Sequence, residues 1–216
     1  MGNLFSIKQA CAHVGLETFI TSDAQEIKMA DAVILPGVGA FGNAMEHLKE
    51  KDLIKTIHEV IAQGKPFFGI CLGMQMLMSE SEEFGRHKGL DIIPGRVIRF
   101  PSRGAKENVI KVPQVGWNQV YLADQFKLNP ERSCWSDLAN GEYMYFVHSY
   151  YVIPQNSNVV ALETVYEDVK YCSGLVKNNI FATQFHPEKS ADKGIKIYQN
   201  WAKLVEKSLI KSILLR

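Results

Sequence analysis

Apolar residues along this chain follow two patterns, short unbroken runs and repeats of three or four residues. Unbroken runs at 32–35 and 66–70 are typical of buried strands. Helical spacing occurs up to Gly15, between 44 and 61, and over 193–206. The apolar faces of these predicted helices are Leu4, Ile7, Cys11 and Val14, then Ala44, Met45, Leu48, Leu53, Ile57 and Ile61, then Ile197, Trp201, Leu204 and Val205.

Weaker patterns fill the remaining sequence. Runs between turn-forming residues predict further strands at 18–21, 96–100, 109–112, 118–122, 143–152, 159–165 and 170–172. A hairpin is expected from 174–177 to 180–185, because Asn178 and Asn179 tolerate left-handed backbone. We expect an acidic helix end or loop at 79–83, helix and loop at 124–138, and an amphipathic continuation of the last helix over 208–216.

Cys71 lies where a predicted strand meets a predicted helix. Gly69 and Gly73 flank it at two residues on either side, which matches the nucleophile-elbow pattern with cysteine in place of serine. The glycines leave room for a strained turn, and a helix starting at Leu72 favours the reactive thiolate. The alternative is a small buried cysteine without chemistry.

A second candidate, His186, follows a strand-like run and is followed by Pro187 and Glu188. A nucleophilic cysteine requires a base, and the base requires a third group that orients its ring. His186 and Glu188 supply both types of group. The alternative is a surface histidine beside a solvated glutamate.

Gly37-Val38-Gly39-Ala40-Phe41-Gly42 follows a predicted strand and precedes a predicted helix. This G-x-G-x-x-G spacing also occurs in dinucleotide-binding loops, which need an acidic residue at the end of the next strand. In this chain the next strand leads to Cys71 instead. The glycines therefore indicate bare backbone beside a ligand rather than a nicotinamide site.

Composition restricts the function classes further. The chain has 216 residues, 46% hydrophobic and 22% charged residues, and a formal net charge of +1. We expect one domain over 1–216, with neither nucleic acid nor membrane as a partner. Four cysteines without paired spacing, no signal peptide and no long apolar segment predict a reduced, cytoplasmic protein without a metal site. The cationic side chains of Arg99, Arg103, Lys106 and Lys111 are expected to be surface charge.

Phe-Gly-Ile-Cys-Leu-Gly-Met-Gln at 68–75 and Gln-Phe-His-Pro-Glu at 184–188 together resemble the class I (triad) glutamine amidotransferases. Within them, the finer resemblance is to the glutaminase subunits of imidazole glycerol phosphate synthase. Further matching segments are 35–42, 113–118 and 146–150. The resemblance implies an α/β three-layer sandwich with a mixed, mostly parallel central sheet. It also implies that the first strand of the family fold is missing before Met1, so we expect the natural start to lie upstream.

The same resemblance implies hydrolysis of glutamine to glutamate and ammonia without a cofactor. The implied roles are nucleophile for Cys71, base for His186 and orienting group for Glu188. The implied oxyanion hole comprises Gly37, Val38, Gly39 and Leu72, and the implied glutamine pocket comprises Gln75, Glu83, His148, Ser149 and Tyr150. Cys134 is expected to be structural.

Ammonia requires an acceptor, and the resemblance implies a (β/α)₈-barrel cyclase subunit that receives it through a channel. Trp117, Asn118, Tyr145 and Lys189 match positions at or near that interface. From the residues alone, Trp117 and Tyr145 are equally well explained as core aromatics. Asn118 and Lys189 are equally well explained as solvated loop residues.

The segment Pro113-Gln114-Val115 departs from the histidine-pathway pattern, which has His-Met or His-Ile after the proline. Three alternatives therefore stay open. The first is a paralogous glutaminase that supplies a surface-sugar amidotransferase. The others are a γ-glutamyl hydrolase with the same triad and a non-catalytic scaffold.

Overall fold

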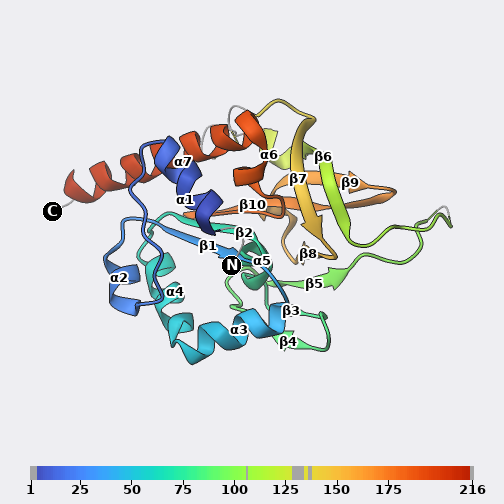
Figure 1. Ribbon diagram of the computed structural model, residues 1–216, viewed down its shortest axis with the longest axis horizontal. Helices are drawn as coiled ribbons and strands as arrows, with labels where there is room; N and C mark the ends of the chain where they lie inside the picture. Colours follow the sequence, from blue (N-terminus) through green and yellow to red (C-terminus); the bar gives the residue numbers. More distant parts are fainter. Residues whose placement is uncertain (1–3, 106, 128–133, 136–137, 215–216) are drawn as a thin grey trace.

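The computed structural model describes residues 4–105, 107–127, 134–135 and 138–214 (Figure 1). The helices are α1 (Leu4–His13), α2 (Ala24–Met29), α3 (Phe41–Glu50), α4 (Leu53–Ala62), α5 (Leu72–Met76), α6 (Asp124–Lys127) and α7 (Ala191–Leu214), with short 3-10 helices at Ser157–Val159 (η2) and Pro187–Lys189 (η3). The strands are β1 (Val33–Gly37), β2 (Phe67–Cys71), β3 (Glu80–Ser81), β4 (His87–Lys88), β5 (Gly95–Arg99), β6 (Gln114–Leu122), β7 (Glu142–His148), β8 (Tyr150–Pro154), β9 (Val160–Tyr166), β10 (Val169–Lys177) and β11 (Ile180–Thr183).

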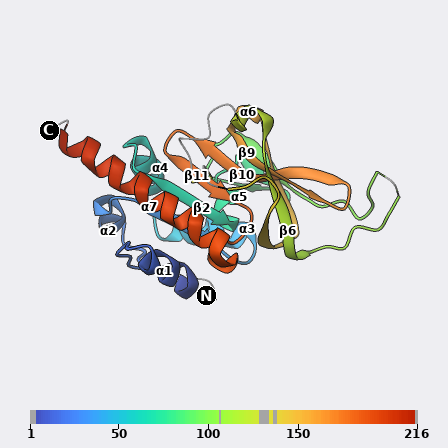
Figure 2. The same ribbon diagram turned by 90° about the horizontal axis from the view of Figure 1, so that it is seen from above.

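β2 forms the middle of a three-layer arrangement. Successive strand residues point to opposite faces, so Phe68 packs against α1 and α7 whereas Phe67 packs against α3 and α4. On the first face, the Phe68 ring lies 5.3 Å from Trp201 and 6.1 Å from Tyr198 between ring centroids. Figure 1 shows α7 above the central strands and α3 and α4 below them, and Figure 2 shows α7 crossing β2 and β11. The unbroken apolar run at 66–70 is thus explained by burial on both faces.

The strands form one curled, mixed sheet. Its order is β1-β2-β11-β10-β8-β5-β3-β4, and β9 and β6 connect β7 to β10. Parallel pairing joins β1 to β2, β2 to β11 and β3 to β5, and the other pairs are antiparallel. The expected sandwich is confirmed, but the sheet is parallel mainly in the part that carries Cys71. The expectation of a mostly parallel sheet is wrong for the remainder.

Several predicted elements differ from the observed ones. Residues 18–21 do not form the predicted strand. Among the described residues β1 pairs with β2 alone, so this segment has no strand with which it pairs. Phe19 and Ile20 are accordingly 58% and 59% exposed. In place of the predicted strand 109–112 the structure has a single bridge between Val109 and Arg103. The segment 79–83, which was expected to be a helix end or loop, contains β3. The predicted strand 143–152 is interrupted at Ser149, between β7 and β8.

Other predictions are confirmed. β10 and β11 form the expected hairpin, in which Lys177 pairs with Ile180 and Asn178 has a φ of 55°. α1 ends before Gly15, whose φ is +81°. α7 continues past 206 to Leu214, so the amphipathic tail extends the closing helix. The predictions for Lys106, 128–133, 136–137 and 215–216 lie outside the described residues.

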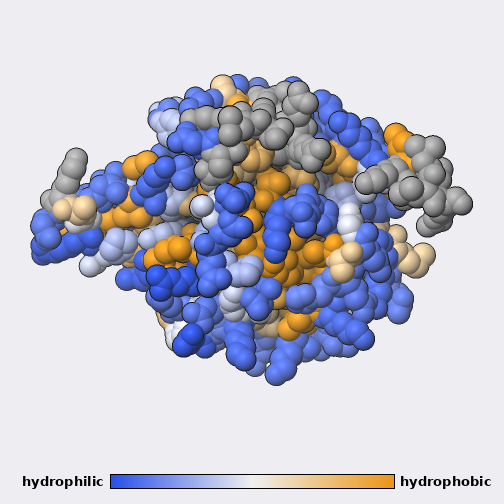
Figure 3. All heavy atoms as spheres, turned by 180° about the vertical axis from the view of Figure 1, so that it is seen from behind, coloured by the Kyte–Doolittle hydropathy of each residue, from blue (hydrophilic) through white to orange (hydrophobic). Residues whose placement is uncertain are grey.

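The surface is mainly polar. Seen from behind, hydrophilic side chains cover most of the molecule, and hydrophobic ones gather near the centre of that face (Figure 3). Among the described residues, no helix combines the length and apolar character needed to cross a membrane.

Candidate active site

Cys71 ends β2 in a strained conformation. Its φ is 55° and its ψ is −109°, in a region that costs a non-glycine residue on the order of 1–3 kcal/mol. Such a conformation persists where surrounding structure holds it, and here Gly37 of β1 pairs with Cys71. Cys71 is buried, as Cys11, Cys134 and Cys172 are, but it also lines a pocket. These features favour the elbow over a plain buried cysteine.

Gly73 explains why the elbow needs glycine. A Cβ atom on Gly73 would lie 1.8 Å from the carbonyl oxygen of Leu35 in β1. A Cβ atom on Gly69 would lie 3.1 Å from the Gly73 oxygen. The turn therefore brings α5 into backbone contact with β1, which places Leu72 beside the loop that follows β1.

His186 and Glu188 lie on the segment that leaves β11. Their side chains meet with Nδ1 of His186 2.8 Å from Oε1 of Glu188, and they are 3% and 0% exposed. The backbone is fixed as well, since the His186 N–H donates to the Tyr145 carbonyl and the Ser190 hydroxyl donates to the His186 carbonyl. The opposite side of the ring is hydrogen-bonded to Cys71. The structure thus brings together three residues that are far apart in the sequence.

The pKa of the His186 ring reflects this environment. Burial alone would lower it, but the hydrogen bonds to Cys71 and to Glu188, together with their negative charge, raise the pKa to about 9. At neutral pH the ring therefore holds a proton between sulfur and carboxylate. An imidazolium beside a cysteine favours the thiolate, which is the nucleophilic form.

We expect His186 to titrate near pH 9 in the folded protein. Because this pKa lies above its ordinary value of 6.5, the protonated ring stabilises the native state. That contribution is complete below about pH 6.5 and is lost as the pH rises through about 9. NMR titration of the ring measures the midpoint, and Glu188→Gln should lower it. A wild-type midpoint near pH 6.5 would contradict the ion pair. So would a midpoint that is the same in the wild type and in Glu188→Gln.

A pocket of about 360 Å³ opens at Cys71. Every predicted oxyanion and glutamine-pocket residue lines it, and Glu188 lies behind His186. The lining is Gly37, Val38, Gly39, Cys71, Leu72, Gln75, Glu83, Pro113, Val147, His148, Ser149, Tyr150 and His186. The pocket thus combines apolar walls with a few polar groups, as small-molecule sites do.

The loop after β1 lies on one side of the sulfur. Gly39 has a φ of +96° and open space where a Cβ atom would lie, so its backbone conformation, not crowding, requires glycine. At Gly37 crowding requires glycine, because a Cβ atom there would lie 2.8 Å from Cβ of Leu72. Val38 between them is exposed. The reorientation of the Gly37–Val38 peptide stays a prediction.

The opposite wall is hydrogen-bonded within the protein. Nε2 of Gln75 donates to the Tyr150 carbonyl at 2.9 Å and to Oε1 of Gln184 at 3.0 Å. His148 is buried with Nδ1 2.9 Å from the same carbonyl, and burial lowers its pKa to about 4. Ser149 and Tyr150 form the corner between β7 and β8. These residues fix the shape of the wall.

The position of Glu83 excludes a dinucleotide-binding loop at 37–42. Its Oε2 atom accepts a hydrogen bond from the Phe41 N–H at 2.6 Å, at the first residue of α3. A pyrophosphate would need this helix N-terminus. A carboxylate already occupies it, so the G-x-G-x-x-G segment is not a dinucleotide loop here. Within the described part of the chain, no group of three or more His, Cys, Asp or Glu residues could hold a metal ion.

The family model of the class-I glutamine amidotransferases matches residues 2–203. The chain belongs to this family. Named relatives agree with the family. The chain is 45% identical over 204 residues to the imidazole glycerol phosphate synthase subunit HisH of Chlorobaculum tepidum, covering 93% of this chain and 94% of the relative. It is 42% identical over 208 residues to the HisH subunit of Aquifex aeolicus, covering 96% and 94%.

Solved structures agree in fold with this amidotransferase chain. A crystal structure of a glutamine amidotransferase matches with a TM-score of 0.69 at 15% identity, covering 95% of each chain. A putative GMP synthase protein from Thermoplasma acidophilum matches with a TM-score of 0.64 at 19% identity, covering 98% of this chain and 91% of the other. Identities this low support the architecture alone.

Of the four predicted interface residues, the amidotransferase carries Trp117, Tyr145 and Lys189 side by side. Trp117 is 53% exposed, so its interpretation as a core aromatic is wrong. Its ring lies 6.1 Å from that of Tyr145, and Nζ of Lys189 lies 5.8 Å from the Tyr145 ring centroid. Asn118 lies in β6 rather than in a loop, and its side chain donates to the Val165 carbonyl. The surface joins β6, β7 and η3.

Gln184 is a site residue to which sequence reasoning assigned no role. Its Nε2 atom lies 3.7 Å from Sγ of Cys71, and its side chain is fully buried. The only signal in the sequence was its place two residues before His186. Pro113 and Val147 also line the pocket without having been predicted to do so. Their position depends on the β6–β7 pairing, which the sequence did not specify.

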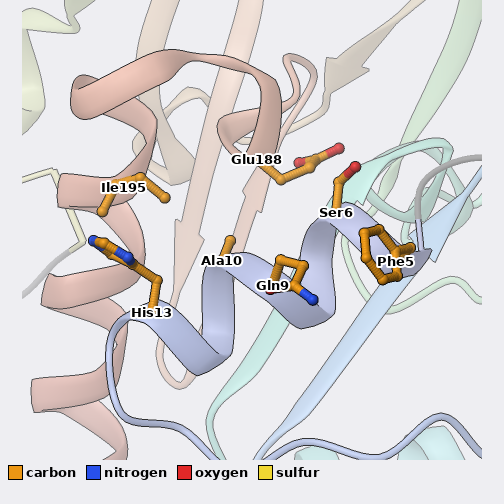
Figure 4. Close-up of a pocket in the computed structure, with 7 residues that line it drawn as sticks. All are labelled: Phe5, Ser6, Gln9, Ala10, His13, Glu188 and Ile195. Atoms are coloured by element: carbon orange, nitrogen blue, oxygen red, sulfur yellow. The ribbon is translucent and has the colours of Figure 1, made fainter.

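A second hollow lies on the far side of Glu188. It is bounded by α1 and α7, and Figure 4 shows the Glu188 carboxylate beside Ser6 of α1. Its other lining residues are Phe5, Gln9, Ala10, His13 and Ile195. α1 thus covers the carboxylate end of the His186–Glu188 pair, while the sulfur end faces the pocket.

Proposed function

We propose that the chain is the glutaminase subunit of an imidazole glycerol phosphate synthase. It hydrolyses L-glutamine to glutamate and ammonia, and a synthase subunit consumes the ammonia in histidine biosynthesis. The observation that carries this proposal is the Cys71–His186–Glu188 arrangement, in which Cys71 and His186 line the pocket. The HisH relatives, which match almost the whole chain, support the pathway.

Cys71 is the proposed nucleophile. Its sulfur attacks the side-chain carbonyl carbon of glutamine, and His186 then donates its proton to the leaving nitrogen, which departs as ammonia. The γ-glutamyl thioester that remains is hydrolysed by a water molecule, which His186 deprotonates. Glutamate leaves and the thiolate–imidazolium pair is restored. Glu188 orients the ring and stabilises its charged form. Residues of this chain carry each step.

Attack creates a negative oxygen that needs backbone donors. The proposed donors are the N–H groups of Leu72, at the first residue of α5, and Val38, between the two glycines. One such donor contributes roughly 3 kcal/mol to the transition state. A Gly37–Val38 peptide that can reorient provides a way to complete or dismantle the oxyanion hole.

The opposite wall is proposed to bind the amino-acid end of glutamine. One Glu83 oxygen is held by Phe41, and the carboxylate charge suits the substrate ammonium group. Both protons of Gln75 Nε2 are used within the protein, so its Oε1 atom is the group left to accept from the substrate amide. His148, Ser149 and Tyr150 form the rest of this wall.

The proposed partner is a (β/α)₈-barrel cyclase, which docks on Trp117, Asn118, Tyr145 and Lys189. The side chains of Trp117 and Lys189 are exposed, and aromatic residues and arginine are enriched at interfaces. The surface is also directly linked to the catalytic segment, because the Tyr145 carbonyl accepts from the His186 N–H. Docking there would place ammonia release close to the partner.

Trp117→Ala should weaken cyclase binding by about 30-fold, since a buried interface tryptophan contributes roughly 2 kcal/mol or more. Tyr121→Ala is the matched control, an exposed aromatic of the same strand. The measurement is ammonia released from glutamine during titration with purified cyclase. Equal half-saturation for both variants would contradict the docking surface. Full activity without cyclase would favour a γ-glutamyl hydrolase, and stimulation only by a sugar-pathway synthase would favour the paralogue.

A further inference from the structure

Hydrogen bonds between uncharged groups connect the pocket wall to the Cys71 sulfur. The Tyr150 carbonyl accepts from Nε2 of Gln75, and the same nitrogen donates to Oε1 of Gln184. Nε2 of Gln184 then lies 3.7 Å from Sγ of Cys71, within hydrogen-bonding range of sulfur. The chain of bonds therefore ends on the proposed nucleophile.

The orientation of both amides is fixed by the Tyr150 carbonyl. A carbonyl oxygen can only accept, so Gln75 must turn its NH₂ group toward Tyr150. That NH₂ group needs an acceptor on Gln184, which leaves the Gln184 NH₂ group facing the sulfur. Reversing either amide would set two donors or two acceptors against each other. The sulfur thus faces a fixed donor.

Gln184 lies where an apolar residue would otherwise be expected. It is fully buried, and its backbone N–H donates to the Ser173 carbonyl at 3.0 Å, beside β10. Burying a primary amide is costly unless its polar atoms have partners. Gln75 and Cys71 supply those partners, which gives a physical reason for glutamine at this position.

A second arm holds the Tyr150 carbonyl from the other side. Nδ1 of His148 lies 2.9 Å from it, and since a carbonyl only accepts, the proton must be on Nδ1. Burial lowers the His148 pKa to about 4, so the ring is neutral near pH 7 and its Nε2 atom is an acceptor. The Tyr171 hydroxyl donates its one proton to Oε1 of Gln114 in β6 at 2.9 Å, and its oxygen lies 3.3 Å from Nε2 of His148.

We propose that Gln184 is a positioning residue whose amide, held by Gln75 and the Tyr150 carbonyl, directs a hydrogen-bond donor at Cys71 and stabilises its thiolate. The Nδ1–H group of His148 keeps the carbonyl in place. The charged groups around the sulfur are His186, with Glu188 behind it, and Glu83 across the pocket. Gln184 adds a neutral donor to this set. The inference rests on the proposed function for its purpose, but thiol reactivity is measurable without glutamine.

The test is the pH dependence of Cys71 alkylation by iodoacetamide, with Cys71→Ala as the blank. Gln184→Met keeps the side-chain length and removes the donor, so alkylation near neutral pH should be roughly tenfold slower, as expected when one hydrogen bond to the charged form is lost. Tyr171→Phe should slow it less than Gln184→Met does, since four groups separate Tyr171 from the sulfur: His148, the Tyr150 carbonyl, Gln75 and Gln184. Tyr166→Phe is the matched control, because its hydroxyl donates to the Lys111 carbonyl outside this network. In glutaminase assays Gln184→Met should lower kcat more than it raises KM.

A Gln184→Met profile identical to the wild-type profile would overturn the inference while leaving the glutaminase intact. A wild-type thiol no more reactive than free cysteine would instead count against the proposed function itself. If circular dichroism shows that Gln184→Met does not fold, the isosteric Gln184→Glu variant replaces it. A carboxylate beside the sulfur should slow alkylation more than tenfold near neutral pH, by the combined loss of the donor and charge repulsion. An unchanged profile in that variant likewise overturns the inference.

Discussion

Cys71→Ala should reduce glutamine hydrolysis by about 10⁴- to 10⁶-fold, the scale seen when a covalent nucleophile is removed from a triad. The reason is that, in the described part of the chain, Cys71 supplies the thiol that lines the pocket beside His186. His186 can still activate water, but without the sulfur it acts on an amide directly. The measurement is glutamate formation in the presence of the cyclase, so that the assay reports the stimulated rate.

Cys11→Ala is the matched control for this loss. Cys11 is fully buried in α1, and burial raises its pKa to about 12, so it stays a thiol and takes no part in chemistry. Its replacement should leave kcat unchanged within about twofold. The Cys71 variant should also keep its cyclase affinity and circular dichroism spectrum, because it removes one sulfur from the pocket. Retained glutaminase activity in Cys71→Ala would reject the assignment.

Glu188→Gln should lower kcat by roughly 10³- to 10⁴-fold, by analogy with the acid-to-amide substitution in serine-protease triads. The amide preserves the shape of the buried side chain, 2.8 Å from His186. It removes the charge that helps to hold the pKa of the ring at about 9. The ring then binds its proton less firmly, so less of the enzyme holds the imidazolium that favours the thiolate and donates to the leaving nitrogen.

Glu142→Gln is the control for this substitution. Its carboxylate pairs with Lys193 at 2.6 Å on the surface between β7 and α7, and exposed pairs contribute little. Its glutaminase activity should equal that of the wild type. If Glu188→Gln lost no more activity than Glu142→Gln, the carboxylate would not orient the base.

The elbow was predictable because it depends on local requirements. An apolar run, two glycines and a cysteine at the junction specify a buried strand that turns sharply into a helix, and the structure has this turn at Cys71. The hairpin at Asn178 was predictable for the same reason. Both features depend on few residues that are adjacent in the chain.

Features that depend on distant neighbours were not predictable. Residues 18–21 have the composition of a strand but no described strand beside them. The exposure of Trp117 depends on which face of β6 is covered, and alternation along one strand cannot decide this for an aromatic residue. Gln184 acquires its place beside Cys71 only when β11 lies parallel to β2.

During turnover, glutamine should acylate the Cys71 sulfur. The most direct measurement is acid quenching of the glutamine-saturated enzyme with its cyclase, followed by peptide mass spectrometry. We expect a mass increase of one γ-glutamyl group on the Cys71 peptide alone, which disappears on treatment with hydroxylamine. A γ-glutamyl group carried by another residue, while glutamine is being turned over, would contradict this expectation.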